Sequence, residues 1–280
     1  MNSPAAQTKR AFIFGTMYID APYKAELVQM WIELHQKLNP EYDLLIIDSH
    51  SERMWLDLIP AIKNIPIHEI KEGDPLPPLQ RGVNWIDFPE GAGHQNFNGV
   101  DGWGRAFSRG VAFAIQHDYE YVVNLECDLL FRNPVTPILD QMDTHHLHVL
   151  STNIKYNKFF PLDWMENTIM FMRTSYLREK DFIRRYDWNG NWTRDNPLYV
   201  PEHRCKAILE PEVFYKPWQG VRGDGGIDLI TQLSDVEEMD YIMHVQHAPN
   251  YPQPLELYYH FMRKYMGQDW IPPHRRSQNV

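Results

Sequence analysis

The chain has 280 residues, of which 43% are apolar and 23% are charged, a composition typical of one large globular domain or two smaller ones. Its formal net charge of −10 argues against non-specific binding to nucleic acid, whose phosphates select basic surfaces. No apolar run approaches the roughly 18–20 residues needed to span a bilayer, and the two cysteines, Cys127 and Cys205, are too few for a disulfide framework.

The beginning of the chain bears on its expected location. Residues 1–10 contain no apolar stretch of the kind that directs export, and we expect them to form a flexible tail. Together with the scarcity of cysteine, this favours a reducing, cytoplasmic setting in which Cys127 is a small core residue. The composition gives no sign of a transmembrane segment, although it leaves open a peripheral contact with a membrane surface.

The first half of the chain alternates between strand and helix patterns. Short apolar runs predict strands, and apolar residues at helical spacing predict an amphipathic helix that begins near Pro22 and ends at Asn39-Pro40. A weaker helical pattern follows the second strand. The predicted elements are strands at 11–15, 43–47 and 65–70 and helices at 22–38 and 52–63. This order predicts parallel strands joined by right-handed crossovers.

The regular alternation stops at Gly73–Gly102, a stretch rich in proline, glycine, asparagine and aspartate. We expect a long loop there, and loops of such length in compact domains are usually functional or disordered. A helix is then predicted over Trp103–His117. It leads into an apolar run at Tyr121–Phe131, whose length and content of valine, leucine and tyrosine indicate a buried strand.

Two carboxylates, Glu126 and Asp128, interrupt this apolar run one residue apart. An unpaired charge inside a protein is costly, so a buried strand has no routine use for two acids. We therefore expect both side chains at the exit of the strand, where a cation or a positively charged ligand group meets them. Open α/β sheets bind their ligands at this carboxyl edge.

The second half of the chain is less regular. Further strands are predicted at 147–150, 168–172 and 241–245, and residues from Pro272 onward have the composition of a flexible tail. No stretch stands out as a linker. We expect one domain at 11–271, with a regular half at 11–135 and an irregular half at 136–271, between flexible tails at 1–10 and 272–280.

The acidic run resembles the D-x-D strand of the GT-A glycosyltransferases, with Glu126-Cys127-Asp128 as an E-x-D variant. Asp101–Gly110 is similar to the helix that precedes that strand, and Ala11–Tyr23 to the opening strand and loop of glycogenin-like members. The resemblance covers about residues 11–135. It implies a GT-A-like α/β fold, with a mostly parallel central sheet flanked by helices, a nucleotide-binding first half and an acceptor-binding second half.

The resemblance also implies an activity. It predicts transfer of a sugar from a nucleoside-diphosphate sugar, with a UDP-sugar expected, to a glycan or another hydroxyl acceptor, assisted by Mn²⁺ or Mg²⁺. Such a cation stabilises the charge of the departing diphosphate, and hard cations prefer carboxylate oxygens. By the same resemblance Asp128 contacts the metal, and Glu126 contacts the metal, the ribose or the sugar. A histidine after the last strand completes the set, and we prefer His247 to His244.

Further residues are candidates for binding the nucleotide donor. Thr16, Tyr18 and Asp48 follow predicted strands directly, at the edge where a base and ribose dock in such sheets. Arg105 and Arg109 are four residues apart and so share one helical face, which we place opposite the apolar stripe. On that face they meet either a diphosphate or solvent.

The catalytic base is predicted less sharply. Asp224 and Asp228 flank the start of an expected helix, where inverting GT-A enzymes carry an acidic pair, and Glu166 is a third candidate. A base must come within hydrogen-bond reach of the acceptor hydroxyl. The stereochemistry stays open, because Lys216-Pro217-Trp218 resembles a motif of retaining, glycogenin-like members. Five aromatic residues either line an acceptor site or pack in the core: Trp164, Trp188, Trp192, Tyr199 and Trp218.

Three other activities compete with glycosyl transfer as explanations of the sequence. A nucleotidyltransferase that makes sugar nucleotides shares the parallel nucleotide-binding half, but its glycine-rich loop is absent, since Gly15 stands alone before Thr16. A non-catalytic protein that binds a nucleotide sugar or carbohydrate would keep the fold without turnover. A glycoside hydrolase needs two carboxylates on either side of the bond it cleaves, and Glu126 and Asp128 are too close in sequence for that role.

Overall fold

The computed structural model of the chain describes residues 9–71, 73–89, 100–155, 163–188, 201–218, 220–222, 239–243 and 255–276, together with residues 190, 196 and 198. An eight-stranded sheet forms its centre, in the order β3-β4-β2-β1-β5-β8-β7-β9. The strands are β1 (Lys9–Met17), β2 (Asp43–Asp48), β3 (Ile67–Glu69), β4 (Val83–Asp87), β5 (Tyr119–Leu125), β7 (Val149–Lys155), β8 (Asp163–Arg173) and β9 (Val213–Tyr215).

The five strands from β3 to β5 run parallel, which confirms the topology expected for the first half. Strand β8 is antiparallel to β5, and β7 is antiparallel to β8. The carboxyl ends of β1, β2, β4 and β5 therefore meet at one edge of the sheet, as they do in other open α/β sheets that bind ligands.

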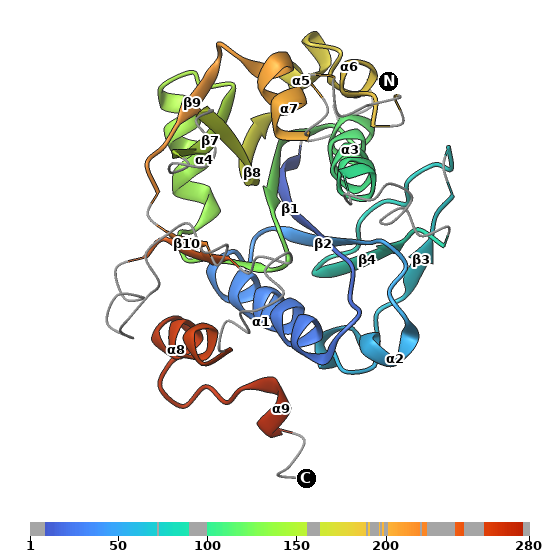
Figure 1. Ribbon diagram of the computed structural model, residues 1–280, viewed down its shortest axis with the longest axis vertical. Coiled ribbons are helices and arrows are strands. Elements are labelled where there is room, and N and C mark those ends of the chain that lie inside the picture. The colour runs from blue at the N-terminus through green and yellow to red at the C-terminus, as the bar shows by residue number, and fades with distance from the viewer. Residues whose placement is uncertain are drawn as a thin grey trace, which may run out of the picture.

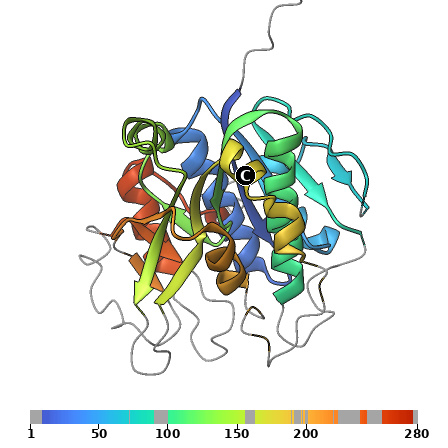
Figure 2. The same cartoon turned by 90° about the horizontal axis from the view of Figure 1, so that it is seen from above.

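Helices cover both faces of the sheet (Figures 1 and 2). Because alternate residues of a strand point to opposite faces, Phe12 and Phe14 of β1 pack on one side and Ile13 on the other. The face with Ile13 carries α1 (Pro22–Leu38), α4 (Val135–Thr144) and α8 (Leu255–Met266), and the face with Phe12 carries α3 (Val100–Gln116), α5 (Thr174–Glu179), α6 (Phe182–Tyr186) and α7 (Pro201–Leu209).

Helix α1 matches its prediction closely, because its start and end signals are local. Pro22 occupies the first turn, where its missing N–H is not needed, and the predicted apolar stripe is buried against the sheet. At the other end the Asn39 N–H donates to the His35 carbonyl at 2.8 Å. The Asn39 side chain accepts from the backbone N–H of Val135 at 2.7 Å, which joins the end of α1 to the start of α4.

After β5 the chain leaves the large sheet for a small one. Strand β6 (Leu129–Phe131) pairs antiparallel with β11 (Tyr241–Met243), which pairs parallel with β10 (Gly220–Arg222). The single long strand predicted at Tyr121–Phe131 is thus two strands in two sheets. The break between them falls on the two carboxylates, which lie at the exit of β5 as expected.

The loop predicted at Gly73–Gly102 is the clearest wrong prediction. Buried strand β4 lies inside that segment and joins β2 to β3, and α3 already begins at Val100. The sequence signal was weak because β4 is short and contains Asn84 and Asp87. The Asn84 amide has a structural use, since it accepts from the Gln80 N–H at 2.8 Å and donates to the Gln80 carbonyl at 2.9 Å.

Two further expectations need correction. The helix predicted at 52–63 consists of two short pieces, α2 (Arg53–Leu56) and a 3₁₀ turn, η1 (Pro60–Ile62). The predicted tail at 272–280 contains α9 (Pro273–Arg276), which is attached to the body of the protein. Arg276 forms an ion pair with Glu33 of α1, and the indole N–H of Trp270 donates to the same carboxylate at 2.7 Å.

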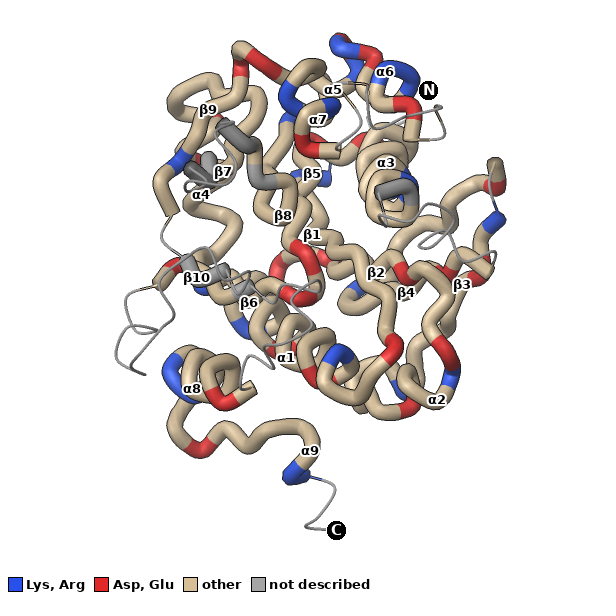
Figure 3. Tube along the Cα trace, in the orientation of Figure 1, with Lys and Arg blue, Asp and Glu red and all other residues tan. Residues whose placement is uncertain are grey.

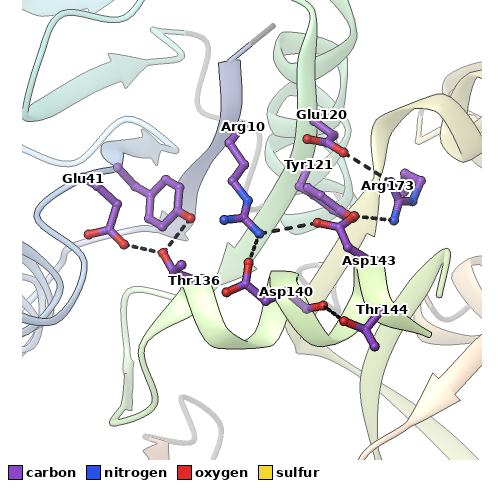
Figure 4. A network of polar contacts seen from close by, with 10 residues as sticks. Arg10, Glu41, Glu120, Tyr121, Thr136, Asp140, Asp143, Thr144 and Arg173 are labelled. Carbon is purple, nitrogen blue, oxygen red and sulfur yellow. Dashed lines mark hydrogen bonds and ion pairs between the residues drawn. The ribbon is translucent and has the colours of Figure 1, made fainter. Parts of the chain in front are cut away.

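A polar network fixes the other edge of the sheet, at the amino ends of β1 and β5 (Figure 4). Arg10 pairs with Asp140 of α4, and β1 begins at Lys9, so residues 9 and 10 belong to the sheet and not to the tail predicted at 1–10. Arg173 contacts Asp143 at 2.9 Å and Glu120 at 3.3 Å. The network ties α4 to three strands at the edge that lies away from the carboxylates.

None of the described helices has both the length and the apolar composition needed to cross a bilayer.

Charged residues are distributed unevenly along the trace. Acidic positions gather near the labels of β1 and β6 and again near those of β4 and β3 (Figure 3).

Candidate functional site

We call Glu126-Cys127-Asp128, between β5 and β6, the acidic turn. It is closed by a hydrogen bond from the Leu129 N–H to the Glu126 carbonyl at 2.9 Å, and all three of its side chains are buried. The indole N–H of Trp31, in α1, donates to the Leu125 carbonyl at 3.1 Å and so holds the residue before the turn. Cys127 is fully buried and confirms the expected core role.

Gly15 of β1 lies against this turn. A Cβ atom added at Gly15 would lie 2.5 Å from the Leu125 carbonyl oxygen, 2.7 Å from the Cys127 Sγ and 2.9 Å from the Cys127 N. All three distances are shorter than any ordinary contact, so only glycine lets β1 approach the acidic turn this closely.

Three protein donors hold the Glu126 carboxylate. Thr16 Oγ1 donates to Oε2 at 2.5 Å, Trp103 Nε1 donates to Oε1 at 2.6 Å, and Asn124 Nδ2 donates to Oε1 at 3.3 Å. The donors come from β1, α3 and β5, and both carboxylate oxygens are engaged. None of the donors carries a positive charge.

Burial raises the pKa of the Glu126 carboxyl from its ordinary value of 4.5 to about 8. The negative charge of Asp128 adds to this rise in pKa, and the hydrogen bonds from Thr16, Trp103 and Asn124 oppose it. The acidic turn therefore holds two acids in a desolvated place, where ionisation of both brings two like charges together and a cation would relieve their repulsion.

This raised pKa predicts a stability that depends on pH. Between about pH 4.5 and 8 the folded protein holds a proton on Glu126 that the unfolded chain releases, so the free energy of unfolding falls as the pH rises through that range. We expect the loss to reach a few kcal/mol in metal-free protein, measured by urea denaturation at several pH values in EDTA. Glu126→Gln should reduce the slope to the part that the raised pKa of Asp48 contributes, and an unchanged slope in that variant would contradict the assignment.

Asp128 is 7% exposed and lies close to helices α1 and α8. Its charge adds to the effect of burial in raising the pKa of Tyr23 in α1 and of Tyr258 in α8. The hydroxyl of Tyr258 is buried and has no hydrogen-bond partner among the described residues. The second carboxylate of the turn thus lies near Tyr23 of α1 and Tyr258 of α8, whereas Glu126 is held partly from α3.

The residues of the turn fit a divalent cation with few protein ligands. Carboxylate oxygens are the ligands that Mg²⁺ and Mn²⁺ prefer, and such ions often bind through one or two carboxylates plus substrate phosphates. Among the described residues no cluster of three or more His, Cys, Asp or Glu side chains is placed to hold a metal. The expected third ligand, His247, and its alternative His244 lie outside the described residues.

Two of the predicted donor-binding residues lie at the same edge. Thr16 is buried and bonded to Glu126, so it belongs to the acidic turn's surroundings. Tyr18 is half-buried, and the Lys24 ammonium lies 5.8 Å from the centre of its ring. The donor-binding roles of both residues remain predictions.

Asp48, the third residue predicted to bind the donor after Thr16 and Tyr18, is fully buried, and its carboxylate accepts hydrogen bonds from Ser51. Ser51 Oγ donates to Asp48 Oδ1 at 2.6 Å, and the Ser51 N–H lies 3.2 Å from the same oxygen. Burial, with the charge of Asp87 adding to it, raises the pKa of Asp48 to about 7. Asp87, the residue of β4 paired with Asp48, was missed because the strand itself was missed. It accepts from the His50 N–H at 3.0 Å.

The structure places Arg105 differently from its prediction. Its side chain is 4% exposed, with the guanidinium 4.1 Å from the centre of the Phe88 ring and 5.5 Å from that of Trp188. It is not on an open face, because the end of β4, unrecognised in the sequence, packs there. Arg109 donates to the carbonyl of Asp74 at 3.0 Å.

The proposed catalytic bases are not placed. Asp224 and Asp228 lie outside the described residues, and so does the side chain of Glu166, whose backbone in β8 pairs with Thr152 of β7. Of the five aromatic candidates, Trp192, Tyr199 and the side chain of Trp164 also lie outside. Trp218 is a core residue, with its ring 5.1 Å from that of Phe131 and 5.7 Å from that of Phe171.

No family model and no curated protein matches the sequence. Solved structures do match the fold. The chain is similar to the galactosyltransferase LgtC, solved with donor and acceptor sugar analogues, with a TM-score of 0.56 and 11% identity over 95% of this chain and 99% of LgtC. It is also similar to apo GlyE of Streptococcus pneumoniae TIGR4, with a TM-score of 0.55 and 10% identity over 91% of this chain and 60% of GlyE.

A third match is the bifunctional glycosyltransferase WbbM, with a TM-score of 0.52 and 12% identity over 94% of this chain and 53% of WbbM. The chain thus spans about half of WbbM but nearly all of LgtC. At such low identities the likeness establishes the architecture, and the GT-A-like α/β fold predicted from the sequence is confirmed.

Proposed function

We propose that this chain is a metal-dependent glycosyltransferase that moves a sugar from a nucleoside-diphosphate sugar, with UDP as the expected nucleotide, to a glycan or other hydroxyl acceptor. The observation that carries the proposal is the buried acidic turn at the carboxyl edge of a GT-A-like sheet, directly beside β1. A fold of this kind and an acid pair at this place support the same reaction independently.

In this proposal the residues of the turn have different tasks. Asp128 holds the divalent cation, and Glu126, held in place by three donors among the described residues, contacts the cation, the ribose or the sugar. The bound cation acts as a Lewis acid that stabilises the charge of the departing diphosphate. The transition state at the anomeric carbon is expected to resemble an oxocarbenium ion.

The remaining roles rest on the predictions from sequence. His247 is proposed as the further metal ligand, and Tyr18 as a platform for the base. Asp224, with Asp228 and Glu166 as alternatives, is proposed to take the proton of the acceptor hydroxyl. We propose action in the cytoplasm on soluble or membrane-associated acceptors.

The test is a thermal-shift screen of nucleotide sugars with MnCl₂ or with EDTA. A ligand that binds only the folded state raises the melting temperature. The rise grows with the logarithm of the ligand concentration once that concentration exceeds the dissociation constant. We expect at least one UDP-sugar to raise it with Mn²⁺ and to lose that effect in EDTA. The same donor should then release UDP in the presence of an acceptor or, slowly, of water.

Other outcomes identify the alternatives. Release of pyrophosphate from a nucleoside triphosphate and a sugar phosphate would identify a nucleotidyltransferase. A metal-dependent shift with a UDP-sugar but no release of UDP under any condition would identify a non-catalytic binding protein. A chain that no nucleotide sugar stabilises would contradict the proposal.

A further inference from the structure

Among the described residues, Trp103 makes the one hydrogen bond from α3 to the Glu126 carboxylate. Its Nε1–H donates to Oε1 at 2.6 Å, a short hydrogen bond. The indole stacks on the Phe107 ring, with the ring centres 4.7 Å apart and the planes 14° from parallel. No local sequence pattern predicts this contact, because the two residues are 23 positions apart.

The platform under the indole is itself fixed. Phe107 is fully buried, and its ring lies 6.0 Å from that of Phe14 in β1 and 5.9 Å from that of Tyr186 in α6. The N–H of Trp103 is therefore presented from a rigid surface, at a fixed place relative to the sheet. A donor held in this way restrains its acceptor rather than following it.

Glu126 needs such a restraint. A glutamate side chain has three rotatable bonds, and the repulsion from Asp128 would turn its carboxylate away from the centre of the acidic turn. Thr16 holds Oε2 from one side, while Asn124 reaches Oε1 only at 3.3 Å. Trp103 thus supplies the strong second anchor, without which the carboxylate can rotate about the bond to Thr16.

We propose that Trp103 is a positioning residue for cation binding: its indole N–H fixes the Glu126 carboxylate and thereby raises the affinity of the acidic turn for a divalent cation. The inference rests on the proposed function, because it takes the acidic turn as the place where the cation binds. Hydrogen-bond partners of this kind, one step removed from a metal, commonly change metal affinity by about 10–100-fold.

The chain offers a matched control in Trp31. Its indole N–H also donates to the segment that carries the turn, but to the Leu125 backbone carbonyl at 3.1 Å and from the opposite face of the sheet. Trp31→Phe and Trp103→Phe remove the same atoms and one hydrogen bond each. Only the second change releases the Glu126 carboxylate.

The experiment titrates metal-free protein with MnCl₂ and follows the melting temperature and the heat of binding. Trp103→Phe keeps the ring on Phe107, and we expect it to fold and to need about 10–100-fold more Mn²⁺ for half-saturation. Trp31→Phe should melt earlier but half-saturate at the wild-type concentration. Equal Mn²⁺ affinities in Trp103→Phe and wild type, or no binding of Mn²⁺ by wild type, would overturn the proposal.

A double-mutant cycle separates positioning from a general loss of structure. In the Glu126→Gln background there is no carboxylate to orient, so adding Trp103→Phe should change the Mn²⁺ affinity no further. An equal loss in both backgrounds would show that Trp103 acts through the fold alone and would contradict the proposal.

A measurement on the wild-type protein does not depend on any variant folding. We expect Mg²⁺ to shift one indole N–H signal in the ¹H–¹⁵N spectrum, the signal that is missing from Trp103→Phe. Mg²⁺-insensitive indole signals would count against the coupling. If these results hold but no nucleotide sugar is turned over, the proposed function fails and the inference about Trp103 stands.

Discussion

Replacing Asp128 with asparagine is expected to abolish the metal-dependent binding of a UDP-sugar while the protein remains folded. Asparagine keeps the shape of the side chain but removes the charge that a divalent cation requires, and in our account this carboxylate is the direct protein ligand. The loss should exceed the roughly 10–100-fold that changes one step removed from a metal commonly produce. The stabilisation of the protein by UDP-sugar and Mn²⁺ in thermal shift measures it.

Asp87→Asn is the matched control for this prediction. Asp87 is also a mostly buried carboxylate at the carboxyl edge of the sheet, 8% exposed, but it belongs to β4 and contacts His50. We expect this variant to keep its dependence on Mn²⁺. If Asp128→Asn binds the donor with an unchanged metal requirement, Asp128 is not the ligand and the acidic turn loses its assigned role.

Replacing Gly15 with alanine is expected to damage both the fold and the site. The new methyl group would lie 2.5 Å from the Leu125 carbonyl oxygen, a backbone atom that cannot move without shifting the end of β5. Overpacking of this kind costs about 1–3 kcal/mol. Because the methyl group would also lie 2.7 Å from the Cys127 Sγ, inside the acidic turn itself, we also expect the half-saturating concentration of Mn²⁺ to rise. Urea denaturation and MnCl₂ titration measure the two effects.

Gly110→Ala serves as the comparison. A Cβ atom there would lie 2.4 Å from the Phe14 ring, an equally tight contact, but with a side chain in the core beneath α3. We expect this variant to lose stability and to keep the wild-type Mn²⁺ affinity. Equal Mn²⁺ affinities in Gly15→Ala and wild type would mean that β1 does not set the position of the acidic turn.

The parts of the fold that the sequence predicts well have local signals. Pro22 marks the start of α1 and Asn39 marks its end. In the structure Pro22 occupies the first turn, and the Asn39 N–H donates to the His35 carbonyl. Strands β1, β2 and β5 are continuous apolar runs, as expected for strands buried on both faces. Strand β4 mixes Asn84 and Asp87 with apolar residues, so its pattern did not stand out.

The same difference applies to the candidate site. The place of Glu126 and Asp128 follows from an apolar strand and its end, and the proximity of Thr16 follows from the parallel pairing of β1 with β5. The contact with Trp103 depends on how α3 packs across the sheet, which no local pattern encodes. Arg105 was expected on an open helical face, because the end of β4 that buries it had not been recognised.

Glu126 illustrates how a motif gains its meaning from its surroundings. In the sequence it is one half of an acid pair, equally suited to a metal, a ribose or solvent. In the folded protein both of its oxygens accept hydrogen bonds from uncharged protein donors, whereas Asp128 lies near Tyr258 of α8. The two acids are therefore not equivalent, and we propose Asp128 as the first ligand of the metal.

The most direct test of the central claim is a crystal structure of the protein with UDP and MnCl₂, with data collected at the manganese absorption edge. The account predicts an anomalous peak about 2 Å from an Asp128 carboxylate oxygen, bridging to the diphosphate of the nucleotide. Nucleotide and manganese bound together elsewhere, with Asp128 contacting neither, would contradict it.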